Sequence, residues 1–229
     1  MNSSDIEIKI PKRIFCFWHD HSSIPSQVQK MLNNTFKTHQ DNCEVIFADD
    51  RYIINLLDMK ENLLWGGLYK ANRIPASRAD MARLVMVYYL GGVYVDASMG
   101  FYQSIFNIIK PESELILCIR DDVNESRITN SIIGGIEGAD FVYDVMEIVT
   151  HNLVSNDFNN DVWKATGPYS INLMHSKLLK KNDITYISML NMKSEYMDYF
   201  RNTKNTPKIV NTWTEQQKNG IFEKPYVIK

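Results

Sequence analysis

Two polar side chains near the middle of the chain, Asp80 and Arg83, lie three residues apart in a segment with helical periodicity. Apolar residues recur there at the i, i+3, i+4 and i+7 spacing of one helix face, namely Met81, Leu84, Val85 and Tyr88. We therefore expect Asp80 and Arg83 to be neighbours on the surface of that helix. A structural role is the alternative to a chemical one: Asp80 would close a capping box with Ser77 and pair with Arg83.

A third candidate, Asp96, follows a short apolar run that begins after Gly91 and Gly92. The glycine pair predicts a helix end and a sharp turn, and residues 93–95 (Val-Tyr-Val) predict a buried strand. In α/β proteins, ligands usually bind at the carboxyl end of such a strand. Mg²⁺ and Mn²⁺ favour oxygen ligands, which a D-x-D pair of carboxylates commonly supplies. Here the triplet is Asp96-Ala97-Ser98, so Asp96 is its only carboxylate, and a turn-forming Asp is the alternative.

The elements around these residues alternate between strand and helix patterns. Residues 13–18 and 43–48 predict strands. Residues 25–39 predict a helix with Val28, Met31, Leu32 and Phe36 on its apolar face, and a second helix to residue 57 has Ile53, Ile54 and Leu57 inward. Residues 63–74 fit either a short helix or an ordered loop. The alternation predicts a parallel sheet covered by helices on both faces.

The second half of the chain continues the pattern less regularly. Residues 105–109 predict a strand end, residues 115–119 and 184–187 predict strands, and residues 128–134 form another apolar run. Residues 141–153 predict a helix, and a further helix after Pro168 has Ile171, Met174, Leu178 and Leu179 inward. From residue 193 we expect loop with short helices. The fold class is therefore α/β, with one domain over residues 1–229 and a less regular C-terminal portion.

Composition excludes several classes of protein. A net charge of -2 offers no basic surplus for nucleic acid. The three cysteines, Cys16, Cys43 and Cys118, lie far apart and predict neither disulfides nor a zinc site. No run is long and apolar enough for a signal peptide or a membrane span, so we expect a cytoplasmic protein. HExxH, GxSxG and GxGxxG motifs are absent from the sequence.

Several segments together resemble glycosyltransferase family 32, which includes fungal mannosyltransferases and bacterial capsule and lipopolysaccharide enzymes. The family is related to the catalytic core of the large clostridial glucosylating toxins. The similar segments, in the family's order, are residues 10–18 (IPKRIFCFW), 77–83 (SRADMAR), 88–96 (YYLGGVYVD), 130–134 (NSIIG), 166–168 (TGP) and 212–213 (TW). The resemblance implies a GT-A fold with a Rossmann-like sheet. It also implies transfer of a hexose from a nucleotide-diphosphate sugar with retention of the anomeric configuration.

The same resemblance implies roles for individual residues. Trp18 would stack on the nucleotide base, with a core tryptophan as the alternative, and Asp50 would contact base or ribose, with a helix N-cap as the alternative. Asp80 would hold sugar hydroxyls, Arg83 the sugar and diphosphate, and Asp96 ribose, sugar and metal. The remaining implied residues are Tyr94, Asn130 and Trp213 at the donor, Ser98 as a weak metal ligand, and Gly167 and Pro168 on the acceptor side. Residues 1–103 would form the donor half and residues 104–229 the acceptor half and C-terminal closure.

The chain departs from the family at the metal site. Ser98 replaces a second acidic residue, and no histidine lies beyond His175, where many members carry one. Our hypothesis is an active enzyme with weakened or absent dependence on Mn²⁺ or Mg²⁺, in which Arg83 and other cations take more of the phosphate charge. The alternatives are a catalytically impaired pseudo-glycosyltransferase serving as a partner subunit, and a nucleotide-binding module.

The substrates are predicted only by analogy. UDP is favoured as the nucleotide because of the related toxins, and a lipid-linked saccharide is the expected acceptor. Residues 193–229 hold seven Lys/Arg against four Asp/Glu, which is compatible with peripheral contact with the inner membrane face. An ordinary solvated surface explains this small excess equally well.

Overall fold

The structure is a computed structural model of the 229-residue chain. It describes residues 7–121, 124, 126–156, 158, 160–178, 183–199 and 216–222, with Asn219 described for its backbone only. Within this part of the chain, the helices are too short or too polar to cross a bilayer.

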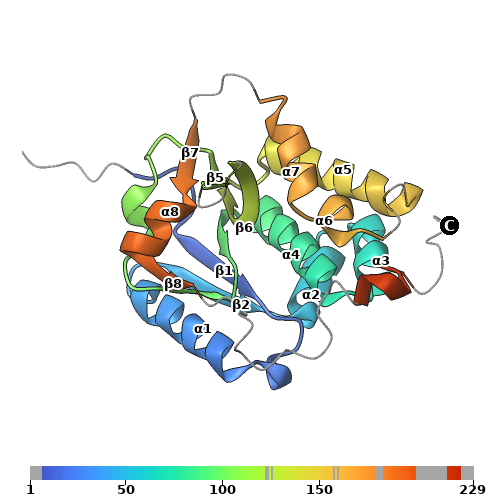
Figure 1. Cartoon of the computed structure of the whole chain (residues 1–229), viewed down its shortest axis with the longest axis horizontal. Coiled ribbons are helices and arrows are strands. Elements are labelled where there is room, and N and C mark those ends of the chain that lie inside the picture. The colour runs from blue at the N-terminus through green and yellow to red at the C-terminus, as the bar shows by residue number, and fades with distance from the viewer. Residues whose placement is uncertain are drawn as a thin grey trace, which may run out of the picture.

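A six-stranded sheet forms the centre of the molecule, in the order β2-β1-β3-β6-β5-β7 (Figure 1). Its strands are β1 (Arg13–Phe17), β2 (Glu44–Ala48), β3 (Gly92–Val95), β5 (Leu115–Arg120), β6 (Arg127–Gly135) and β7 (Ile184–Ser188). Neighbours β2-β1-β3 and β5-β7 are parallel, whereas β6 is antiparallel to β3 and β5. The short connection from Arg120 to Arg127 explains this reversal, because a parallel crossover needs a dozen residues or more. The predicted α/β class is confirmed, with one antiparallel strand in a mostly parallel sheet.

Helices and a two-stranded ribbon cover the two faces of the sheet (Figure 1). One face packs against α2 (Asp50–Met59), α3 (Leu63–Ala71), α4 (Pro75–Leu90), α5 (Asp140–Ser155), α6 (Val162–Ala165) and α7 (Pro168–His175). The other face packs against α1 (Ser26–His39), the β4 (Met99–Phe101) and β8 (Met197–Tyr199) ribbon, and α8 (Met189–Asn191). Single turns complete the described chain: η1 (His21–Ser23), η2 (Ile105–Ile108), η3 (Met192–Tyr196) and η4 (Gln217–Asn219).

Side-chain alternation along the strands produces these two cores. In β1, Ile14 and Cys16 pack on the side of α1, while Phe15 and Phe17 pack on the side of α4. All four are buried, as expected for a parallel strand covered on both faces. The predicted strands at residues 13–18, 43–48, 93–95, 115–119 and 184–187 are confirmed to within about two residues at each end.

Helix α4 corrects the expectation that Asp80 and Arg83 lie on a helix surface. The helix packs against β1, β3 and β6 and is also contacted by α2 and α5, so it is enclosed on nearly every side. Residues 80–87 are all buried, while Tyr88 is only half-buried. A polar side chain in such a helix must find its partners inside the protein.

Other local predictions were wrong for similar reasons. Phe36 is 51% exposed, and Thr35 and His39 take the inward positions of α1. Thr35 and His39 form hydrogen bonds with β4 and η2, which the sequence did not place against α1. Residues 105–108 form the turn η2 instead of a strand end. Helix α7 ends at His175, so Leu178 lies beyond the helix, although its side chain packs against the core as expected. Leu179 lies outside the described residues.

The ambiguous segment at residues 63–74 is largely the helix α3, whose N-cap Asn62 accepts a hydrogen bond from the Trp65 N–H. At the other end of α4, Gly91 and Gly92 have φ of 62° and 126°, conformations that favour glycine. The predicted glycine stop is thus confirmed, and the chain turns there into β3, an inner strand of the sheet with Asp96 at its carboxyl end.

Candidate active site

A cavity of about 470 Å³ opens where β3 and β5 end and β6 begins. Helix α4 contributes Asp80 and Arg83 to it, and Asp96 follows directly after β3. The remaining wall comes from the β5–β6 turn, from the α6–α7 corner and from the segment after β7. These parts contribute Arg120, Arg127, Asn130, Trp163, Pro168, Met189, Lys193 and Tyr199, among others.

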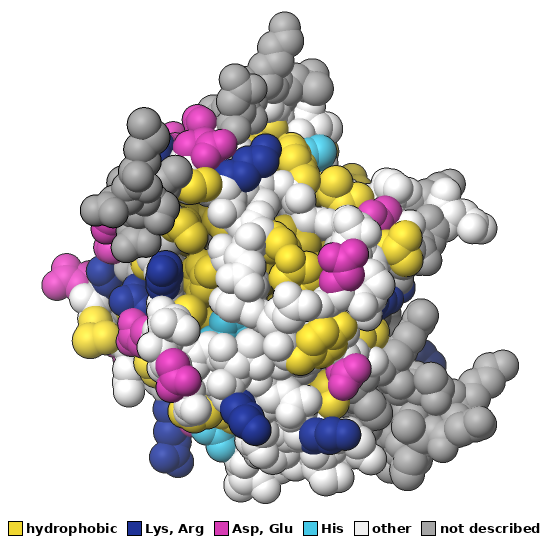
Figure 2. Space-filling view, turned by 90° about the vertical axis from the view of Figure 1, so that its left-hand side faces the viewer, with side chains coloured by type: hydrophobic (Ala, Val, Ile, Leu, Met, Phe, Trp, Pro, Cys, Tyr) yellow, Lys and Arg dark blue, Asp and Glu magenta, His cyan; other side chains and the backbone are white. Residues whose placement is uncertain are grey.

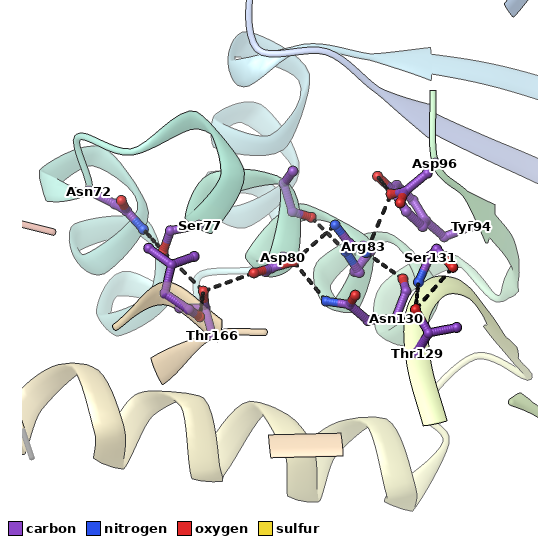
Figure 3. A network of polar contacts seen from close by, with 12 residues as sticks. Asn72, Ser77, Asp80, Arg83, Tyr94, Asp96, Thr129, Asn130, Ser131 and Thr166 are labelled. Atoms are coloured by element: carbon purple, nitrogen blue, oxygen red, sulfur yellow. Dashed lines mark hydrogen bonds and ion pairs between the residues drawn. The ribbon is translucent and has the colours of Figure 1, made fainter. Parts of the chain in front are cut away.

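Asp80 is the most fully partnered acid of this cavity (Figure 3). Its Oδ1 lies 3.0 Å from an Arg83 guanidinium nitrogen and accepts a hydrogen bond from Asn130 Nδ2 at 2.7 Å. Its Oδ2 accepts from Thr166 Oγ1 at 3.1 Å, and Thr166 Oγ1 in turn lies 3.2 Å from Ser77 Oγ. Three different elements thus fix the carboxylate in one orientation.

Ser77 belongs to this network and not to a helix cap. The helix begins at Pro75 after Ile74, so Ser77 is already inside it, where its hydroxyl accepts from Asn72 Nδ2 at 2.7 Å. The capping-box alternative for Asp80 is therefore wrong. The pairing of Asp80 with Arg83 is confirmed.

Arg83 links Asp80 to Asp96 (Figure 3). One terminal nitrogen lies 3.4 Å from Asp96 Oδ1 and donates to the carbonyl of Asn130. The guanidinium also lies over the ring of Tyr94, 4.7 Å from its centroid, and the Tyr94 hydroxyl donates to Asp96 Oδ1 at 3.1 Å. A buried charge needs partners of this number and quality, because burial without them is strongly unfavourable.

Burial dominates the acid–base properties of these groups. It raises the pKa of Asp80 to about 6, although Arg83 and the Thr166 hydrogen bond act in the opposite direction. Burial also raises the pKa of Asp96, again opposed by Arg83. For Arg83 burial lowers the pKa, but Tyr94, Asp96 and Asp80 outweigh it and the guanidinium stays charged. The cavity thus contains a permanent cation between two carboxylates whose charge depends on pH.

Asp96 is the carboxylate with room for a ligand. Its side chain is 31% exposed, against 10% for Asp80 and 6% for Arg83. Asp96 also forms the turn that was the alternative to a binding role, because its carbonyl accepts a hydrogen bond from the Met99 N–H. Its carboxylate nevertheless faces Arg83 and Tyr94.

Other residues expected at the donor or acceptor are also near this site. Tyr94, Asn130 and Pro168 contact the network or line the cavity. Gly167 is the N-cap residue of α7, where a Cβ would lie 2.8 Å from the Trp163 carbonyl oxygen.

Trp18 and Asp50 do not line this cavity and lie beyond β1 and β2. Asp50 accepts from the Tyr69 hydroxyl at 2.7 Å and pairs with Arg78 at 2.5 Å. The N-cap alternative for Asp50 is wrong, because the preceding residue, Asp49, caps α2. Trp18 is half-buried, and its buried Nε1 has no hydrogen-bond partner among the described residues. An unpartnered buried donor of this kind is more consistent with a ligand contact than with a purely structural tryptophan.

The residues around Asp96 do not form a complete metal site. In the described part of the chain, no cluster of three or more His, Cys, Asp or Glu side chains is placed to hold an ion. Asp96 Oδ1 is already engaged by Arg83 and Tyr94, and Ser98 supplies only a neutral hydroxyl. Trp213, expected at the donor, lies outside the described residues, so its placement stays a prediction.

Several residues of the site had no recognisable sequence signal. Arg120, Arg127 and Lys193 line the cavity, yet each is a single cation outside any motif. Thr166 belongs to the T-G-P segment, but nothing in the sequence predicted its hydrogen bond to Asp80. Only the strand register, in which Arg120 and Arg127 lie opposite each other, shows that the two arginines belong to one place.

The fold is similar to that of solved glycosyltransferase domains and has a GT-A-like architecture. The chain is similar to the structure described as the PaToxG glycosyltransferase, with a TM-score of 0.61 at 15% identity over 75% of this chain and 71% of that one. It is also similar to the ligand-free glycosyltransferase domain of the YGT toxin, with a TM-score of 0.59 at 8% identity over 79% and 80% of the two chains. At such identities the likeness establishes the fold.

The sequence comparison is more specific. Residues 25–116 match the family described as a glycosyltransferase sugar-binding region containing a DXD motif. No curated protein matches the sequence. This segment is therefore similar to the sugar-binding region of that family, which agrees with the resemblance to family 32. The matched segment contains Asp80, Arg83 and Asp96, and here the motif reads Asp96-Ala97-Ser98.

Proposed function

We propose that the protein transfers a hexose from a nucleoside-diphosphate sugar to a saccharide acceptor, with retention of the anomeric configuration. The observation that carries this proposal is a pair of contacts in which Arg83 lies between Asp80 and Asp96. All three residues line the cavity and belong to the segment that matches the sugar-binding region. Synthesis of surface polysaccharide or lipopolysaccharide is the process that we propose, with a lipid-linked acceptor.

The three residues suit the charge changes of such a transfer. The bond between the anomeric carbon and the diphosphate oxygen breaks, and its electron pair stays on the diphosphate. The acceptor oxygen bonds to the anomeric carbon, and the acceptor proton passes to the leaving phosphate. Arg83 stays charged, so it can stabilise the charge that develops on the diphosphate. Asp96 and Asp80 offer acceptors for sugar hydroxyls, which fixes the orientation of the anomeric carbon.

The nucleotide would lie beside the first two strands. Trp18 follows β1 and Asp50 begins α2 after β2, so both lie at the carboxyl ends of parallel strands, where ligands of α/β sheets bind. Neither Trp18 Nε1 nor the buried Nε of Arg78 has a hydrogen-bond partner among the described residues, so both are available donors there. We favour UDP as the nucleotide, and Asp50 would contact its base or ribose while it holds Arg78 in place.

We further propose that Mn²⁺ or Mg²⁺ is weakly required or not required. Asp96 and Ser98 would hold a metal ion poorly, since one is engaged by Arg83 and the other is neutral. No step of the proposal depends on a metal. Donor hydrolysis in excess EDTA would retain most of its rate, and complete loss restored only by Mn²⁺ would overturn this part of the proposal.

Binding and hydrolysis of donors test the proposal directly. UDP-glucose, UDP-galactose and GDP-mannose are added with and without Mn²⁺, and the melting temperature and release of free sugar are measured. We expect a UDP-sugar to raise the melting temperature, because a ligand that binds only the folded state stabilises it. Asp96→Asn should lower hydrolysis at least about 100-fold. Arg51→Gln, an exposed arginine of α2, is the matched control. If no nucleotide sugar binds, the proposal is wrong.

Ser98 in place of a second carboxylate favours one alternative, a catalytically impaired glycosyltransferase that binds nucleotide sugar as a partner subunit. Binding without hydrolysis over several hours would support it, since slow release of sugar requires a working site. A cytoplasmic location with peripheral contact at the inner membrane face stays a proposal. Sedimentation with vesicles of stated anionic lipid content would test it.

A further inference from the structure

Cations outnumber acids among the described residues that line the cavity. Among the described residues that line it, Arg83, Arg120, Arg127 and Lys193 are cationic, whereas Asp80 and Asp96 are acidic. Both acids contact Arg83. The other three cations come from β5, β6 and the segment after β7.

Two of these cations are paired by the sheet itself. Arg120 ends β5, Arg127 begins β6, and the register places them directly opposite each other. A planar guanidinium donates charge-assisted hydrogen bonds in pairs, so an anion between or beside the two arginines can accept hydrogen bonds from both of them.

Aromatic side chains place two of the cations at the cavity. The Arg127 guanidinium lies over the Trp163 ring at 5.8 Å from its centroid, and Lys193 Nζ lies over the Tyr199 ring at 5.0 Å. Both rings also line the cavity. Cation–π contacts of this kind orient flexible side chains and so reduce the ordering that binding requires.

On the face seen in Figure 2, acidic and basic side chains are interspersed. The match to the sugar-binding region ends at residue 116, before all three cations. The cluster therefore belongs to the half of the cavity that the donor-binding family segment does not supply.

We propose that Arg120, Arg127 and Lys193 bind an anionic group of the acceptor, a carboxylate or a phosphate near the hydroxyl that accepts the hexose. This inference rests on the proposed glycosyl transfer and specifies the substrate class of its acceptor. Trp163 and Tyr199 border the same position and offer apolar faces to the acceptor sugar ring.

The test uses simple sugars as probes. Glucuronic acid, glucose 6-phosphate and neutral glucose are titrated into the full chain at constant ionic strength, with and without saturating UDP. We expect at least one anionic sugar to bind about tenfold or more tightly than glucose. Preference for glucuronic acid assigns a carboxylate, and preference for glucose 6-phosphate assigns a phosphate. Equal binding of all three sugars would overturn the proposal.

Variants connect the preference to the cluster. Arg120→Gln and Arg127→Gln should each reduce the preference for the anionic sugar about tenfold, and Arg127→Lys should retain part of it. Arg51→Gln should retain all of it, and melting curves verify that each variant folds. If the Gln variants instead weaken UDP-glucose binding and leave the sugar preference intact, the cations serve the donor diphosphate and the inference is wrong.

The two proposals can fail separately. Absence of binding and hydrolysis with every nucleotide sugar contradicts glycosyl transfer, and the sugar titrations without nucleotide still report on the cluster. Donor hydrolysis by a protein that does not distinguish anionic from neutral sugars contradicts only the acceptor proposal.

Discussion

Thr166 offers a way to change the charge of Asp80 without touching the carboxylate itself. Its hydroxyl is buried and donates to Asp80 Oδ2 at 3.1 Å. Thr166→Val keeps the branched shape and removes the donor. A hydrogen bond to an ionised group contributes about 1.5–3 kcal/mol. One pKa unit corresponds to about 1.4 kcal/mol, so the pKa of Asp80 should rise from about 6 by about one to two further units.

Activity should report this shift. If ionised Asp80 holds the donor sugar, kcat/KM for hydrolysis of UDP-glucose falls on the acid side with the pKa of Asp80. The acid limb of the wild type should lie near pH 6. In Thr166→Val the acid limb of the pH profile should move up by about one to two pH units. Asp80 would then be mainly protonated at pH 7, and the variant would be only weakly active there.

Stability supplies an independent readout with a defined sign. Because the pKa of Asp80 in the folded protein lies above its ordinary value of 3.8, the folded protein prefers the protonated form. The stabilisation is complete below the unfolded pKa and is lost as the pH rises through the folded pKa. Thr166→Val should therefore lower the free energy of unfolding by about 1.5–3 kcal/mol more at pH 9 than at pH 5.

Thr38→Val is the matched control. Thr38 Oγ1 donates to the carbonyl of Phe101 at 2.7 Å, so its acceptor carries no titratable charge. Its loss should cost about 1 kcal/mol at both pH values, as measured by urea denaturation. An acid limb that does not move in Thr166→Val, together with equal destabilisation at pH 5 and pH 9, would refute the assignment of Asp80.

Three further predictions concern other parts of the structure. Arg83→Lys cannot reach Asp80, Asp96 and the Asn130 carbonyl together, so donor hydrolysis should fall at least about 100-fold, measured at saturating UDP-glucose. Gly92→Ala should lower the free energy of unfolding by more than about 2 kcal/mol, because its Cβ would lie 2.7 Å from the Arg13 carbonyl oxygen at positive φ. Gly138→Ala, also at positive φ but with open space around it, should cost only about 1 kcal/mol in the same urea titration. Burial lowers the pKa of His39 from 6.5, and its Nε2 accepts a hydrogen bond from the Ile105 N–H at 3.2 Å. The free energy of unfolding should therefore fall as the pH decreases through 6.5 in the wild type, and it should not do so in His39→Gln.

The sequence predicted those parts of the fold that depend on local patterns. The strands around Phe15 and Tyr94 were recognisable because both faces of each strand are apolar, and Gly91 because a positive φ requires it. The surroundings of α4 were not predictable from its own residues. Asp80 and Arg83 look like surface residues until β6 and the α6–α7 corner, much later in the chain, bring Asn130 and Thr166 against Asp80. The reversal of β6 and the burial of His39 likewise depend on contacts between distant segments.

The burial of α4 also bears on the altered D-x-D motif. A guanidinium enclosed with two carboxylates neutralises only part of their charge, and burial keeps the pKa of both acids raised. A second carboxylate at position 98 would add negative charge beside Asp96 and would need a divalent cation to offset it. With Ser98 instead, Arg83 and Tyr94 already engage the Oδ1 atom of Asp96. The substitution is therefore consistent with a site whose charge balance depends on Arg83, and the expected insensitivity of donor hydrolysis to EDTA follows from the same balance.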